Sequence, residues 1–91
     1  MPARVYLSTL GRPLDPAEAS ISAHDRGFLF GDSVFETLRT AGGRPVEWAR
    51  HLARLRRSAA GLGLAIPWPD DELRRIADAT HAATGDDDSV L

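Results

Sequence analysis

The stretch VFETLRTAGGRPVEWARHLARLRRSAAGL, residues 34–62, carries the strongest structural signal in the sequence. Its first half, residues 34–48, has two runs of β-forming residues on either side of Gly42 and Gly43, which predicts a β-hairpin. Its second half, residues 48–62, repeats apolar residues at three- and four-residue spacing, which predicts an amphipathic helix. The stretch therefore favours a fold of the α+β class.

Alternation along the first run divides its side chains between two faces. Glu36 falls on the more apolar face, between Val34 and Leu38, where a carboxylate needs a partner. The opposite face either lines a small-molecule cleft or packs on the core with its arginine reaching water, and the residues alone leave the two readings even. The members of this face are Phe35, Thr37 and Arg39.

Weaker patterns on both sides of this stretch complete the predicted fold. Residues 4–10 are rich in β-formers and predict a strand. A second helix is expected over residues 70–84, because acidic residues at its start suit the helix dipole and Gly85 suits its end. Residues 89–91 look like the opening of another strand, so we expect residues 1–91 to be a piece of a longer chain. The expected architecture is an antiparallel sheet with two helices packed on one side.

Composition excludes several classes of protein. With 91 residues the chain forms one small domain at most, and its net charge of −2 argues against a dedicated nucleic-acid binder. There is no cysteine, the three histidines have no ligand spacing, and no apolar run is long enough to cross a bilayer. We therefore expect no metal site, no membrane contact and a cytoplasmic location. The absence of lysine removes Schiff-base chemistry from these residues.

Four arginines on the predicted helix at residues 48–62 are the first candidate for anion binding. They are Arg50, Arg54, Arg56 and Arg57. A planar guanidinium suits a phosphate, but a basic helix face is more often simply solvated, and composition alone favours the solvated reading. Arg54 differs from the others because it borders the apolar stripe and cannot point fully outward.

Three motifs together resemble the class IV, or fold type IV, pyridoxal-phosphate enzymes. They are GFLFGDSVFETLR at residues 27–39, the pair Gly43 and Arg44, and HLARLRRSA at residues 51–59. The family comprises the branched-chain and D-amino-acid aminotransferases and aminodeoxychorismate lyase. The match runs from about Val5 to the last residue and covers the smaller N-terminal domain of the two-domain fold, so residues 1–91 are expected to be that domain.

The resemblance implies a role for five residues. Arg54 corresponds to the arginine that binds the phosphate of pyridoxal 5'-phosphate. Phe35, Thr37 and Arg39 correspond to the strand residues that face substrate and cofactor. Phe30 corresponds to a position at the rim of the pocket, where many relatives have tyrosine, and the missing hydroxyl removes any hydrogen bond made there.

The resemblance also implies an enzyme that these residues do not complete. The family's Schiff-base lysine lies in the larger C-terminal domain, which is expected to be the intramolecular partner, and no catalytic residue is expected among residues 1–91. The intact protein is expected to be a homodimeric aminotransferase that moves an amino group between an amino acid and a 2-oxo acid.

Two other functions stay open at this point. Thr37 stands where branched-chain enzymes usually have glycine, which resembles aminodeoxychorismate lyase, the enzyme that forms 4-aminobenzoate and pyruvate. The other is a small interaction or nucleic-acid-binding module that uses the arginine-rich helix.

Overall fold

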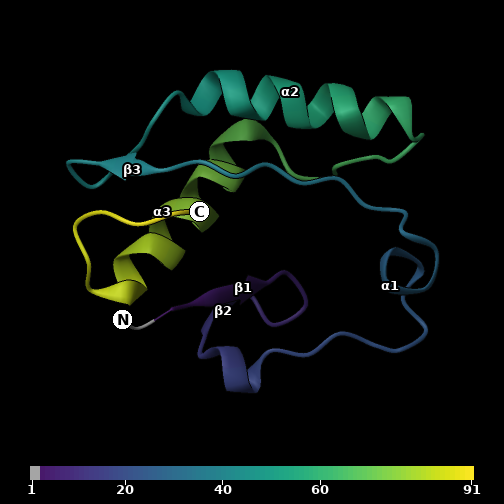
Figure 1. The fold of residues 1–91 in the computed structure, drawn as a ribbon, viewed down its shortest axis with the longest axis horizontal. Helices are drawn as coiled ribbons and strands as arrows, with labels where there is room; N and C mark the ends of the chain where they lie inside the picture. Colours follow the sequence, from purple (N-terminus) through teal and green to yellow (C-terminus); the bar gives the residue numbers. More distant parts are fainter. Residues whose placement is uncertain (1–2) are drawn as a thin grey trace.

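Residues 3–91 are described by a computed structural model, and they form two short antiparallel ribbons and a set of helices (Figure 1). The strands are β1 (Val5–Leu7), β2 (Arg12–Leu14), β3 (Thr40–Ala41) and β4 (Arg44–Pro45). The helices are the 3-10 turn η1 (Pro16–Glu18) and the α-helices α1 (Arg26–Phe30), α2 (Trp48–Gly61) and α3 (Asp70–Thr84). The predicted α+β class is confirmed, although the antiparallel pairing occurs in two separate ribbons, β1–β2 and β3–β4.

The β1–β2 ribbon packs against α3 and buries Leu14. Val5 pairs with Leu14 and Leu7 with Arg12. The predicted strand stops at Leu7 because the next residues turn back, with the amide of Gly11 donating to the carbonyl of Leu7 (2.9 Å). Leu14 is only 1% exposed, and α3 packs on this ribbon.

The predicted hairpin at residues 34–48 is shorter than its sequence pattern indicates. Gly42 and Gly43 make the turn with φ of 60° and 77°, a left-handed geometry typical of two-residue hairpins. The paired strands are only two residues long, followed by one more bond from the amide of Val46 to the carbonyl of Arg39 (2.8 Å), because Glu47 adopts φ 54° and begins α2. Residues 34–39 are extended and lie outside the two ribbons.

The last three residues run antiparallel to this extended segment. The amides and carbonyls of Leu38 and Leu91 bond to each other in both directions (3.0 and 2.7 Å), and the amide of Thr40 donates to the carbonyl of Ser89 (2.9 Å). His81 of α3, which is 7% exposed, forms a hydrogen bond between its Nδ1 and Oγ of Ser89 (2.7 Å). The extended conformation predicted for residues 89–91 is therefore confirmed.

The two long helices lie close to their predicted bounds. Leu52 and Ala59 are the buried residues of α2, and the guanidinium of Arg74 in α3 lies over the ring of Trp48 in α2 (5.8 Å). The extended segment runs beneath α2 and in front of α3 (Figure 1). No helix in the part of the chain that the structure describes is both long enough and apolar enough to span a bilayer.

Helix α1 was not predicted, because five residues are too few to show a helical period. The carboxylate of Asp25 caps its start by accepting the amide of Phe28 (3.2 Å). Gly31 ends it in the left-handed conformation.

Candidate functional site

A three-residue charged cluster joins the extended segment to α2. Glu36 comes from the extended segment, and His51 and Arg54 lie one turn apart on α2, so their side chains share one side of the helix. Oε1 of Glu36 lies 2.8 Å from Nδ1 of His51 and 2.8 Å from Nη2 of Arg54. Nε of Arg54 is 3.1 Å from each carboxylate oxygen. Glu36 therefore has two partners, His51 and Arg54, where the sequence indicated that it needs one.

Glu36 and Arg54 are both charged at neutral pH. The hydrogen bonds from Arg54, and then those from His51, hold the pKa of the Glu36 carboxyl below its usual 4.5. The same carboxylate raises the pKa of Arg54. The Glu36 side chain is 14% exposed and that of Arg54 is 58% exposed, so the carboxylate is covered while the guanidinium reaches water.

The guanidinium of Arg54 is oriented by Glu36, but not all of its N–H groups form hydrogen bonds with the described residues. Its Nε and Nη2 groups face Glu36, whereas within residues 3–91 no acceptor binds Nη1. A guanidinium has five N–H donors in a rigid fork, so the remaining edge is free to bind an anion. This fits a phosphate group, although Arg54 lies at the surface and does not line any of the cavities described below.

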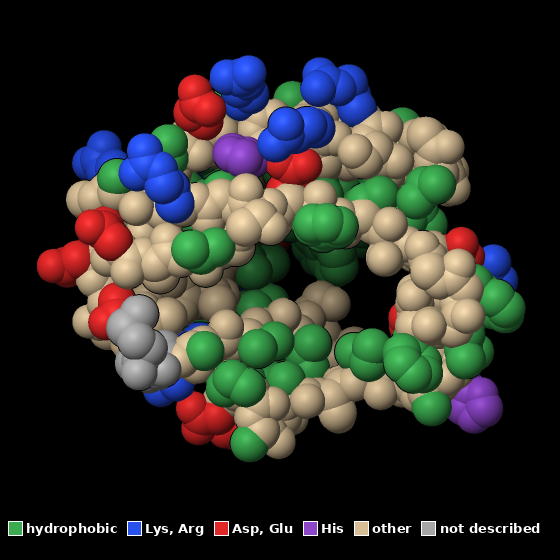
Figure 2. All heavy atoms as spheres, viewed as in Figure 1, with side chains coloured by type: hydrophobic (Ala, Val, Ile, Leu, Met, Phe, Trp, Pro, Cys, Tyr) green, Lys and Arg blue, Asp and Glu red, His purple; other side chains and the backbone are tan. Residues whose placement is uncertain are grey.

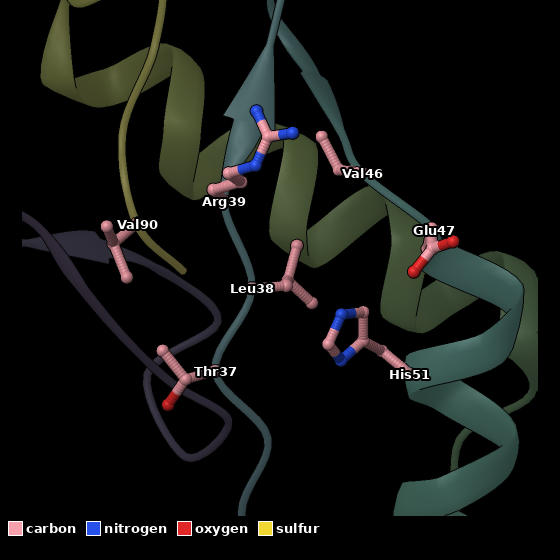
Figure 3. A pocket seen from close by; sticks show the side chains of 7 residues that line it. All are labelled: Thr37, Leu38, Arg39, Val46, Glu47, His51 and Val90. Atoms are coloured by element: carbon pink, nitrogen blue, oxygen red, sulfur yellow. The ribbon is translucent and has the colours of Figure 1, made fainter.

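Thr37 and Arg39 from the predicted strand face line an open cavity of about 600 Å³ together with His51 (Figure 3). The cavity is completed by Leu38, Val46, Glu47 and Val90. The described residues provide no carboxylate within ion-pair distance of Arg39, so its charge is available to an anionic group at this cavity. The structure therefore brings two of the four candidate substrate residues together.

The two aromatic candidates lie elsewhere. Phe35 is 83% exposed and borders a second cavity, of about 320 Å³, which Trp48 of α2 and the cluster residues Glu36 and His51 also line. Phe30 is 67% exposed on α1, with the guanidinium of Arg26 over its ring (5.2 Å). Neither phenylalanine lines the cavity of Thr37 and Arg39.

The residue that sequence reasoning missed is His51. Metal-ligand spacing gave no reason to single it out, and residues 3–91 contain no group of three or more potential metal-binding side chains. Two signals together point to it. Glu36 needs a partner, and His51 lies three residues before Arg54 on a predicted helix.

The sequence model of the family described as amino-transferase class IV matches residues 33–90, which contain Glu36, His51 and Arg54. The chain belongs to the class IV aminotransferase family. This confirms the family resemblance that the motifs around the hairpin and α2 indicated. Every residue of the charged cluster, and three of the four substrate candidates, lie in the matched region of this class IV chain.

Curated relatives of this class IV chain include D-alanine aminotransferases. The protein of Staphylococcus aureus (strain N315) is 34% identical over 86 residues, which cover 90% of this chain and 30% of that protein. The protein of Listeria monocytogenes (serotype 1/2a, strain 10403S) is 39% identical over 59 residues, 65% of this chain and 20% of that protein. The chain thus spans less than a third of the length of these relatives.

Proposed function

We propose that this chain is the phosphate-binding and substrate-facing part of a pyridoxal-phosphate aminotransferase, which moves an amino group between an amino acid and a 2-oxo acid. Membership of the class IV family supports the type of reaction. The observation that carries the proposal is the guanidinium of Arg54, which is oriented by Glu36 along one edge and has a free N–H group on the other. That edge suits a phosphate dianion.

The residues of this chain would divide the binding work. When bound, the cofactor supplies an electron-withdrawing ring that stabilises negative charge at the substrate carbon. Arg54 binds its phosphate, and Arg39 and Thr37 bind a substrate carboxylate, whereas Phe30 and Phe35 lie away from this cavity and are given no part in it. The sequence has no lysine, so the residue that transfers the proton lies outside these 91 residues.

D-Alanine is the first amino acid to test as the donor, since the relatives above are named D-alanine aminotransferases. Lyase activity is the second candidate, because the threonine that resembles aminodeoxychorismate lyase, Thr37, lies at the cavity. The two activities differ in the substrate that each consumes and in the need for an amino acceptor. An aminotransferase consumes D-alanine only with a 2-oxo acid present, whereas a lyase releases pyruvate from aminodeoxychorismate with no amino acceptor.

The arginines of α2 are poorly arranged for a nucleic-acid surface. Arg50 pairs with Glu47, Arg54 with Glu36, and Arg56 with Asp70. Binding along a nucleic acid needs a row of cations without anionic partners, whereas a single phosphate needs only one directed N–H group. The basic side chains that gather over α2 in Figure 2 are interleaved with acidic ones, which argues against the nucleic-acid-binding module.

Removing the guanidinium of Arg54 tests the proposal. In the full-length protein, Arg54→Ala should weaken the binding of pyridoxal 5'-phosphate by about 10- to 100-fold, the value of one charge-assisted hydrogen bond. The dissociation constant is measured from the change in cofactor absorbance.

Arg57→Ala is the matched control, because Arg57 is exposed on the same helix and has no ion pair among the described residues. We expect this variant to bind the cofactor like the wild type. Unchanged affinity in Arg54→Ala would overturn the proposal.

A further inference from the structure

The carboxylate of Glu36 is the shared acceptor for the two polar residues of α2 that face it. We propose that Glu36 is a positioning residue, whose carboxylate orients the guanidinium of Arg54 and fixes the ring of His51 as the tautomer protonated at Nδ1. The inference rests on the proposed binding of the cofactor phosphate by Arg54. Glu36 itself would touch neither cofactor nor substrate.

The contacts to Arg54 show how the orientation is set. An arginine side chain that is 58% exposed samples many rotamers unless a partner holds it. Here Nε and Nη2 both meet the carboxylate, at 3.1 and 2.8 Å, so the plane of the guanidinium is fixed. The edge that carries Nη1 is then presented in one direction before any anion arrives.

The contact to His51 determines where its proton lies. A carboxylate only accepts hydrogen bonds, so Nδ1 at 2.8 Å from Oε1 must carry the hydrogen. Nη2 of Arg54 lies 3.4 Å from this Nδ1, and the two donors converge on the same oxygen. In the neutral ring Nε2 is left as an acceptor.

His51 borders both cavities, and its free nitrogen faces the larger one. His51 lines this cavity with Thr37 and Arg39, and its ring nitrogen away from the helix is directed toward Leu38 and Arg39 (Figure 3). The cavity thus has a cation on one wall and a hydrogen-bond acceptor on another. The carboxylate of Glu36 sets both the phosphate-side donor and this acceptor.

An opposing effect of Glu36 is its own negative charge, which repels a phosphate. Arg54 already neutralises that charge at contact distance, and water screens what remains because the guanidinium is exposed. Losing the orientation of Arg54 affects every bond that the arginine makes to the phosphate. We therefore expect removal of the carboxylate to weaken anion binding rather than strengthen it.

The first experiment measures affinity in the full-length protein at about 0.15 M salt. Glu36→Gln should weaken the binding of pyridoxal 5'-phosphate by about tenfold, as is typical when a residue that orients a ligand-binding side chain is lost. Inorganic phosphate, used as a competitor, should weaken in the same direction. Combined with Arg54→Ala, the Glu36→Gln substitution should cause no further loss, because Glu36 acts through Arg54.

Glu72→Gln is the matched control. Glu72 also forms an ion pair with an arginine, Arg75, and the pKa of its carboxyl is also lowered, but it lies on α3 outside the cluster. We expect this variant to bind the cofactor like the wild type. Glu36→Asp, which keeps the charge on a shorter side chain, provides a second variant if Glu36→Gln does not fold, and its loss of affinity should be smaller than tenfold.

The second experiment observes the His51 ring by ¹⁵N NMR without cofactor. The wild type should show a protonated Nδ1 and an unprotonated Nε2 in the neutral ring, and Glu36→Gln should show both tautomers. A change in stability alone would not move this signal.

The outcomes separate the two proposals. If Arg54→Ala loses affinity but Glu36→Gln does not, the positioning role is overturned and the proposed function stands. If His51 is protonated at Nε2 instead, the tautomer assignment is overturned. If Arg54→Ala keeps full affinity, the proposed function fails, and the positioning of Arg54 for a phosphate fails with it.

Discussion

At the scale of single residues, the carboxylate of Glu36 is the shared hydrogen-bond acceptor of His51 and Arg54. The extended segment places Glu36 on its inner side among hydrophobic neighbours, where an unpaired charge would be costly. His51 and Arg54 remove that cost by bonding to it from α2. The same contacts that stabilise the half-buried carboxylate leave Nη1 of Arg54 and Nε2 of His51 without a partner among the described residues.

The lowered pKa of Glu36 predicts how stability depends on pH. Its carboxyl titrates below 4.5 in the folded chain because Arg54 and His51 bond to the charged form. The stabilisation is therefore fully present above pH 4.5 and is lost as the pH falls through the lower, folded-state pKa. We expect the difference in unfolding free energy between wild type and Glu36→Gln to shrink below pH 4.5.

Denaturant unfolding of both proteins between pH 3 and pH 7 measures this difference. The groups that face the carboxylate are His51 and Arg54 of α2, and Arg54 stays charged throughout this range. A difference that stayed constant to pH 3 would contradict the prediction.

At the scale of elements, the turn between β3 and β4 fixes where the extended segment ends and α2 begins. Gly43 has φ 77°, where a side chain is strained, while a Cβ added there would meet no other atom within 4 Å. Gly43→Ala should therefore destabilise the fold by about 1 kcal/mol through backbone strain alone. Denaturant unfolding of the full-length protein gives this value.

Gly61 provides the comparison at the end of α2. It also has open space for a Cβ, but its φ is helical, so Gly61→Ala should stabilise the fold by about 0.5 kcal/mol. The two substitutions remove the same hydrogen and differ only in backbone conformation. Equal effects at the two positions would show that the turn does not require its left-handed geometry.

At the scale of the whole molecule, the described residues expose an unusual amount of apolar surface. Hydrophobic side chains border an opening through the middle of the molecule between the β1–β2 ribbon and the elements above it (Figure 2). Phe28, Phe30 and Phe35 are each more than 60% exposed. Surface of this kind usually meets other protein, and the chain spans only 30% of its staphylococcal relative.

We expect this apolar surface to be covered in the full-length protein. Phe28→Ser should then lower the free energy of unfolding by about 2 kcal/mol, the value of burying one large apolar side chain. Phe28→Leu, which keeps most of the apolar area, should have a much smaller effect. Thermal unfolding of the two variants makes the comparison, and an unchanged Phe28→Ser protein would show that α1 stays exposed.

Local patterns were enough to predict much of this chain. The period of apolar residues predicted α2 and α3 because each helix depends on residues three and four positions apart. Gly42 and Gly43 predicted the turn because few other residues adopt its backbone angles. The motifs around Arg54 indicated the family, which the match over residues 33–90 confirms.

By itself, then, the sequence determined the two long helices α2 and α3, the turn at Gly42 and Gly43, the alternating faces of residues 34–39 and the need of Glu36 for a partner. Only the tertiary structure decided that His51 and Arg54 are that partner, that the antiparallel pairing splits into two ribbons, and that Phe35 lies apart from the cavity of Thr37 and Arg39. The physical reason is the separation along the sequence over which each interaction acts. Backbone preferences act between near neighbours, whereas a bond between residues 15 or 18 positions apart depends on the path of the chain between them.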